Sequence, residues 1–113
     1  MEANMVSHLN EGPYRLIESG VKTIELRVND EKRRKLKKGD IIEFINRSTD
    51  ESLYTKVKEL HYFKDFKELY PHFPKEALGY LPEEEAHPED MDAYYPIEEQ
   101  EKYGVVGIEI EKV

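Results

Sequence analysis

Residues 20–28 read Gly-Val-Lys-Thr-Ile-Glu-Leu-Arg-Val, which is the most specific local feature of the chain. From Thr23 to Val28 polar and apolar residues alternate strictly, which is the period of a β-strand. The alternation places the three aliphatic residues on one face and Thr23, Glu25 and Arg27 on the other. The stretch therefore predicts a strand with one apolar and one charged face.

The residues before this strand favour a short helix over 13–19. Pro13 suits a first helical turn, where its missing N–H costs nothing, and Tyr14, Leu16 and Ile17 supply apolar side chains. Gly20 then stands where a left-handed residue commonly ends a helix. We expect Gly20 to reverse the chain into the strand.

Further strands and helical turns follow at short intervals. A turn over 38–40 precedes a second predicted strand, and a polar turn over 46–52 joins it to a third as a hairpin. Asp65 with Glu68 predicts a capped helix start, and an aromatic stripe is expected to pack on the sheet. These further predicted elements are strands over 41–45, 53–62 and 105–110, helical turns over 74–78 and 88–95, and the stripe of Phe63, Phe66, Tyr70 and Phe73.

This order of elements predicts one α+β domain spanning residues 1–113. Hairpin-linked strands with helices gathered in two places indicate a small, mostly antiparallel, partly closed β-barrel flanked by short helices. A doubly wound parallel sheet is excluded, because strands do not alternate with crossover helices and no glycine-rich phosphate loop follows a strand. We expect one barrel core, capped by Phe66 and Tyr70 and made of Ile24, Leu26, Phe44, Val57, Ile108 and Ile110.

Charge is distributed unevenly along the chain. The formal net charge of -8 argues against non-specific electrostatic binding to nucleic acid. However, residues 15–47 hold ten basic against six acidic residues, whereas residues 76–101 hold ten acidic residues and no Lys or Arg. The run Arg33 to Lys38 could form a phosphate-facing rim or simply a solvated loop.

Several classes of site lack the residues they need. With no cysteine, the chain has no disulfide-linked partner, thiol nucleophile or Cys-based zinc site. The four histidines show no metal-ligand spacing, so we predict no metal and no cofactor. No apolar run approaches the roughly 20 residues that span a bilayer, and the first residues do not resemble a signal peptide. We therefore expect a cytoplasmic protein without a membrane partner.

Lys22, Glu25 and Arg27 place three ionisable groups at one strand start. Glu25 and Arg27 are expected on the same face about 7 Å apart, and the long Lys22 side chain could reach over that face. Alternating charges on a strand are also typical of a solvated surface with weak ion pairs. The residues alone leave both interpretations open.

The spacing Gly20-x-Lys22-x-x-Glu25-x-Arg27 resembles the signature of the ASCH (activating signal cointegrator homology) domain family, whose members are PUA-like β-barrels. The similarity extends over nearly the whole chain, through residues 29–33, 38–44 and 103–109. It implies a cleft between barrel and helices that binds RNA or a nucleoside-like small molecule. The expected ligand-binding residues are Lys22, Thr23, Glu25, Arg27, Arg33 and Tyr95.

The same resemblance leaves an enzyme as the alternative. Some relatives are similar to an amidohydrolase of N4-acetylcytidine, and others to a metal-assisted ribonuclease. In the first group the residue three after the signature Lys is a Thr proposed as the nucleophile, but this chain has Glu25 there. The catalytic residues would then be Lys22, Glu25 and Glu89, with Glu98 as the second choice for the last position. A protein-interaction module that uses the acidic segment is a third possibility, and the sequence does not predict the oligomeric state.

Tyr94 and Tyr95 are adjacent aromatics in the acidic segment. Neighbouring residues cannot share one helix face. If one ring enters the core, the other is expected to be exposed or to line the cleft.

Overall fold

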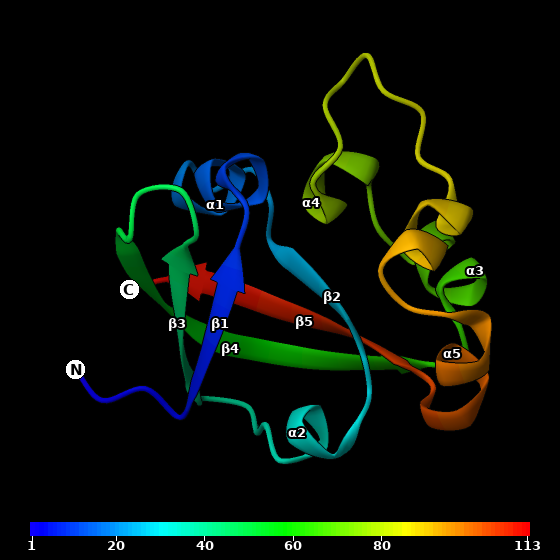
Figure 1. The fold of residues 1–113 in the computed structure, drawn as a ribbon, viewed down its shortest axis with the longest axis horizontal. Helices are drawn as coiled ribbons and strands as arrows, with labels where there is room; N and C mark the ends of the chain where they lie inside the picture. The colour runs from blue at the N-terminus through cyan, green and yellow to red at the C-terminus, as the bar shows by residue number, and fades with distance from the viewer.

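A computed structural model describes residues 1–113, and its centre is one mixed five-stranded sheet (Figure 1). The strand order is β1-β3-β4-β5-β2, with β1 parallel to β3 and every other pair antiparallel. The strands are β1 (Met5–Leu9), β2 (Ile24–Val28), β3 (Ile41–Asn46), β4 (Ser52–Phe63) and β5 (Val105–Lys112). The structure thus confirms the α+β class.

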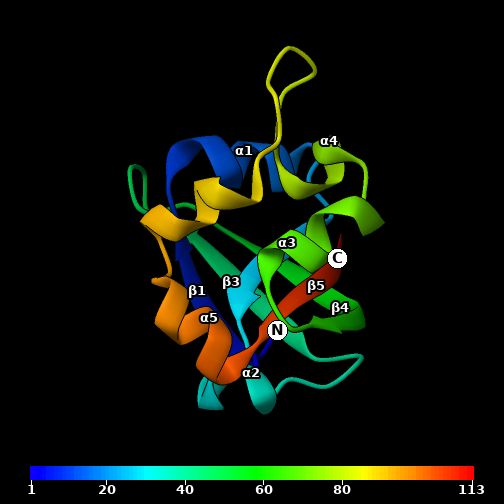
Figure 2. The same cartoon turned by 90° about the vertical axis from the view of Figure 1, so that its right-hand side faces the viewer.

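Short helices lie around the sheet. They are α1 (Glu11–Glu18), α2 (Glu31–Arg34), α3 (Phe66–Leu69), α4 (Lys75–Leu78) and α5 (Ile97–Tyr103), with the 3-10 turns η1 (Tyr70–His72) and η2 (Pro88–Ala93). Helices α1 and α4 lie at one end of the half-barrel and α2 at the opposite end (Figures 1 and 2). None of these helices has the length and apolar character that a membrane span requires.

The two edge strands, β1 and β2, face each other although no ladder joins them. Arg27 of β2 donates from Nη2 to Ser7 Oγ of β1 at 2.9 Å. Lys32, just beyond β2, donates to the Val6 carbonyl oxygen at 3.4 Å. The sheet therefore curls into a half-barrel whose open seam is bridged by side chains, which confirms the expected partial closure.

The turn into β2 follows the predicted chemistry. Gly20 has φ +85°, its N–H donates to Ile17 O at 3.0 Å, and the N–H of Val21 donates to Leu16 O at 3.1 Å. These two bonds satisfy carbonyls that the helix end leaves without partners. Asp65 likewise caps α3 by accepting from the Glu68 N–H at 2.9 Å. The structure thus confirms the predicted end of α1 before Gly20 and the predicted start of α3 after Asp65.

The apolar core is divided in two by the sheet. One cluster holds Phe44, Val57, Ile108 and Ile110. A second cluster, which includes the helical aromatics Phe66 and Tyr70, holds Ile24 and Leu26. All eight residues are buried as predicted, but the expectation of a single core is wrong.

The faces of β2 explain this division. Glu25 pairs with Ile108 and Arg27 with Val106 in the antiparallel register, so the charged residues share the face of the first cluster. The aliphatic face points instead toward α3 and α4, which supply its apolar partners. The predicted alternation is correct, but the charged face of the strand points into the half-barrel.

Three elements were missed by the sequence analysis. β1 carries the polar Ser7 at its buried centre, which breaks the apolar alternation of a strand. α2 is one turn of charged residues, and the only buried residue of α5 is Gln100, so neither has an apolar stripe. The other predicted strands and helical turns match the observed ones within two residues at each boundary. The aromatic stripe does not lie on one helix, because Phe63 ends β4 and Phe73 is extended after η1, although all four rings pack in the second cluster.

Gly20 and Gly12 provide a matched test of this backbone geometry. Gly12 lies in α1 without a positive φ, and an added Cβ would meet no atom within 4 Å. We expect Gly20→Ala to lower the free energy of unfolding by about 1–2 kcal/mol, because alanine disfavours the left-handed region. Gly12→Ala should leave it unchanged or raise it by up to about 1 kcal/mol. Urea denaturation measures both, and equal effects of the two substitutions would contradict the described turn.

Candidate functional site

Lys22, Glu25 and Arg27 form one buried cluster, called here the charge triad. Lys22 Nζ lies 3.2 Å from Glu25 Oε1, and Arg27 Nη2 lies 2.9 Å from Glu25 Oε2. Glu25 is 4% exposed. Each carboxylate oxygen therefore holds a different cation, and the triad is not a solvated strand face.

The charges of the triad stabilise one another. Burial alone would raise the pKa of Glu25, but the charges of Lys22 and then Arg27 outweigh it and lower that pKa to about 2. Burial likewise opposes the charge of Arg27, yet the Glu25 carboxylate holds the pKa of Arg27 above its ordinary value. Glu25 is therefore ionised throughout the neutral pH range.

Backbone geometry fixes Lys22 at the start of β2. Its N–H donates to Leu16 O at 3.0 Å, next to the turn at Gly20. Gly79, the left-handed cap of α4 with φ +105°, lies against the Lys22 side chain, so that an added Cβ would be 3.0 Å from Lys22 Cδ. The glycine at position 79 thus leaves room for the lysine to reach Glu25.

Arg27 connects the triad to two distant segments. Besides its bond to Ser7 of β1, it donates from Nη1 to Tyr95 Oη at 3.4 Å. Tyr95 follows η2, and its ring stacks on Phe66 with centroids 6.1 Å apart. One guanidinium therefore links both sheet edges to the segment that precedes α5.

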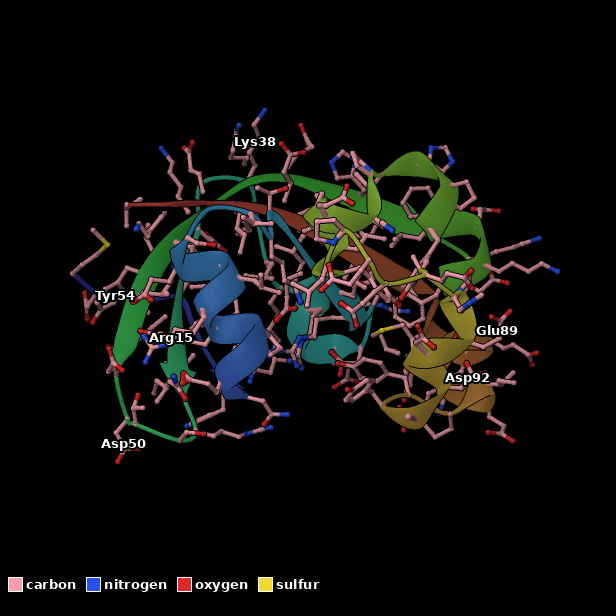
Figure 3. The ribbon with its side chains drawn as sticks, turned by 90° about the horizontal axis from the view of Figure 1, so that it is seen from above. Arg15, Lys38, Asp50, Tyr54, Glu89 and Asp92 are labelled. Carbon is pink, nitrogen blue, oxygen red and sulfur yellow. The ribbon has the colours of Figure 1, made fainter.

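The triad opens into a cleft of about 780 Å³, called here the main cleft. On one side its lining includes His8 of β1, Asn10 between β1 and α1, and Arg47 in the turn after β3. On the other side it comes mainly from the α4–η2 segment. Figure 3 shows α1 and the Glu89-bearing segment on opposite sides of this region. The second side contributes the aromatic and acidic residues Tyr70, Tyr80, Glu84, Glu89, Asp90, Tyr94 and Tyr95.

Three of these residues form a hydrogen-bonded chain. The Tyr70 and Tyr80 hydroxyl oxygens are 2.8 Å apart, and Tyr80 donates to Asp90 Oδ2 at 2.8 Å. Burial raises the pKa of both phenols, and their hydrogen bond raises that of Tyr80 further. Both hydroxyls therefore stay protonated and present fixed polar groups to the main cleft.

The structure brings together most of the residues that the sequence singled out. Lys22, Glu25, Arg27, Glu89 and Tyr95 all line the main cleft, whereas Glu98 does not. As expected for the tyrosine pair, Tyr95 packs on the core while Tyr94 lines the cleft with 69% of its surface exposed. What these side chains bind or catalyse stays a prediction.

Two predicted ligand contacts lie elsewhere. Thr23 lines a separate pocket of about 280 Å³, and its N–H is bonded to Ala77 O at 3.0 Å. Arg33 belongs to α2, and its Nη1 lies 3.6 Å from Asp30 Oδ2. Figure 1 shows β2 running from the end of the half-barrel that carries α1 and α4 to the end that carries α2. No residue of Arg33 to Lys38 lines the main cleft. This run therefore forms no rim of the main cleft, and whether Arg33 binds a ligand stays a prediction.

Other lining residues were missed. Arg47 lies in a polar turn, where nothing in the local sequence separates it from a solvated cation. Tyr80 directly follows Gly79, and a tyrosine beside a helix-ending glycine in an acidic region is a signal that could have indicated it. No three His, Asp or Glu side chains are grouped as metal ligands would be.

Comparison with known proteins identifies relatives over nearly the whole chain. The ASCH domain model matches residues 8–113. The crystal structure of hypothetical protein PH0355 is similar at TM-score 0.80 and 38% identity, covering 96% of this chain and 98% of its own. The solution NMR structure of protein PF0455 from Pyrococcus furiosus is similar at TM-score 0.70 and 35% identity, covering 96% of both chains. No curated protein matches.

The lowered pKa of Glu25 predicts how stability depends on pH. The folded-state pKa of about 2 lies below the ordinary 4.5, so the unfolded state binds more protons between these values. The resulting stabilisation, about 3 kcal/mol, is present above pH 4.5 and is lost as pH falls toward 2. Urea denaturation from pH 6 to 2 measures it.

Two substitutions give the controls. Glu25→Gln should be less stable than wild type at pH 6, because two buried cations lose their counter-charge. Between pH 6 and 2 it should lose less stability than wild type does. Glu98→Gln removes an exposed carboxylate outside the cleft and should retain the wild-type profile. If Glu25→Gln and wild type showed the same acid sensitivity, the carboxylate would not be charged as described.

Proposed function

This chain belongs to the ASCH domain family, and we propose that its main cleft binds a nucleobase or nucleoside. The observation that carries the proposal is the charge triad beneath a cleft lined by tyrosines. A cleft of about 780 Å³ is within the usual range for small-molecule sites. Fixed polar groups beside aromatic rings match the recognition of unstacked bases.

Each part of the main cleft has a chemical role in this proposal. Tyr94 is largely exposed and offers a ring face on which a base can stack. Lys22 and Arg27 carry donors that can hold a base carbonyl oxygen. Both oxygens of Glu25 are already engaged, so Glu25 acts as a positioning residue that holds the two cations in place.

The charges around the cleft favour a small ligand over a long RNA strand. The basic run after β2 lies at the far end of the half-barrel, where it cannot guide a strand into the cleft. Glu84, Glu89 and Asp90 line one side and would repel successive phosphates. A nucleoside avoids this repulsion and offers hydroxyl and amino donors to the carboxylates.

Hydrolysis of N4-acetylcytidine is the second candidate function. It is supported by the presence of Lys22 and Glu89 in the same cleft. However, the position of the nucleophile is occupied by Glu25, and the charged partner of Lys22 is that carboxylate. We expect N4-acetylcytidine to bind without release of acetate. Rapid acetate release that is abolished by Lys22→Ala would reverse the order of the two candidates.

Stacking on Tyr94 gives the most direct binding test. Loss of a base–aromatic contact is worth about 1–3 kcal/mol, so Tyr94→Ala should weaken nucleoside binding by about tenfold or more. Tyr62 on β4 is the matched control, since it is 55% exposed and lies outside the main cleft. Calorimetric titration with the common ribonucleosides and N4-acetylcytidine measures both variants. Absence of binding by wild type, or equal losses in both variants, would refute the proposal.

A further inference from the structure

Arg47 is the cation of the main cleft that has no carboxylate partner. Lys22 and Arg27 are both paired with Glu25. Arg47 lines the same cleft, but no Asp or Glu oxygen lies within 4.0 Å of its guanidinium, whose one side-chain bond is from Nη1 to Asn10 Oδ1 at 3.3 Å. Its positive charge is therefore available to a ligand.

The position of Arg47 is fixed by the backbone and by a buried neighbour. Its N–H donates to Leu9 O at 2.9 Å, which holds it beside the end of β1. Asn46 is fully buried, donates to Glu11 Oε1 at 2.7 Å and accepts from the Ser48 N–H at 2.9 Å. The turn that carries Arg47 is thus held against α1, and the cation needs little backbone ordering when it binds.

The two sides of the main cleft differ in charge. Arg47 lies on the side of β1 and α1, whereas Glu84, Glu89 and Asp90 line the opposite side together with Tyr94. Figure 3 shows the Glu89-bearing segment across from α1. A ligand that satisfies both sides has an anionic group at one end, and an aromatic ring with hydrogen-bond donors at the other.

We propose that the main cleft takes a free nucleoside 5′-monophosphate, with its phosphate on Arg47 and its base against Tyr94. This inference rests on the proposed function and extends it. Arginine binds phosphate oxygens through two parallel N–H donors, and such charge-assisted bonds are stronger than neutral ones. The carboxylates of the opposite side accept from base amino groups and repel the phosphate, so they favour this orientation over the reverse.

A mononucleotide also fits better than the 5′ end of an RNA. Each further nucleotide of a strand would bring another phosphate toward the acidic side of the cleft. Residues 76–101, which form that side, hold ten acidic residues and no Lys or Arg. The proposal therefore commits to a single nucleotide.

The test compares each common ribonucleoside with its 5′-monophosphate by calorimetric titration. In wild type we expect the phosphate to increase affinity by about tenfold, the size of one charge-assisted contact. Arg47→Gln should lose this gain, measured as the ratio between that variant's own affinities for the nucleotide and for the nucleoside. Arg34→Gln makes the same charge change at an exposed arginine of α2 outside the cleft, and it should keep the gain.

The outcomes separate this inference from the proposed function. If nucleosides bind but the phosphate adds nothing, or if the gain survives in Arg47→Gln, the phosphate site is refuted while the nucleoside cleft stands. A 5′-phosphorylated trinucleotide that binds more tightly than the mononucleotide would identify an RNA end as the ligand. If neither nucleosides nor nucleotides bind, the proposed function fails and this inference fails with it.

Discussion

A buried carboxylate between two cations is the constraint on which the rest of this structure depends. Glu25 points into the half-barrel and holds Lys22 on one oxygen and Arg27 on the other. Through Arg27 the same carboxylate is connected to Ser7 on the opposite edge strand and to Tyr95 beside η2. The same ion pair, Glu25 with Arg27, therefore bridges the open seam of the half-barrel and forms part of the wall of the main cleft.

Burying such a contact costs desolvation free energy, and removing one of its partners destabilises the fold. Transferring a charge from water into the protein interior is unfavourable. A buried ion pair therefore adds little net stability compared with well-packed apolar residues in the same place. Removing only one partner is different, because the other charge then stays buried without a counter-charge. This lowers the free energy of unfolding by about 3–5 kcal/mol. The triad is thus better explained by the geometry it imposes than by the stability it adds. It keeps two cations at fixed positions beside a solvent-accessible cleft.

The sequence predicted this arrangement only in part. Strict alternation correctly placed Glu25 and Arg27 on one face of a strand, and the glycine after α1 correctly marked the turn into it. Which face of β2 points inward was not predictable from alternation, because it depends on α3 and α4 covering the aliphatic side. Arg47 and Tyr80 reach the cleft only through contacts between distant segments, and no local period encodes such contacts.

The most direct test of the triad is the nitrogen NMR spectrum of the Arg27 guanidinium at neutral pH. A guanidinium held by Glu25, Ser7 and Tyr95 cannot rotate freely, so wild type should give separate, slowly exchanging Nη1 and Nη2 signals. Exposed Arg47 should give one averaged signal in the same spectrum, and Glu25→Gln should average the Arg27 signals as well. An averaged Arg27 signal in wild type would contradict the account.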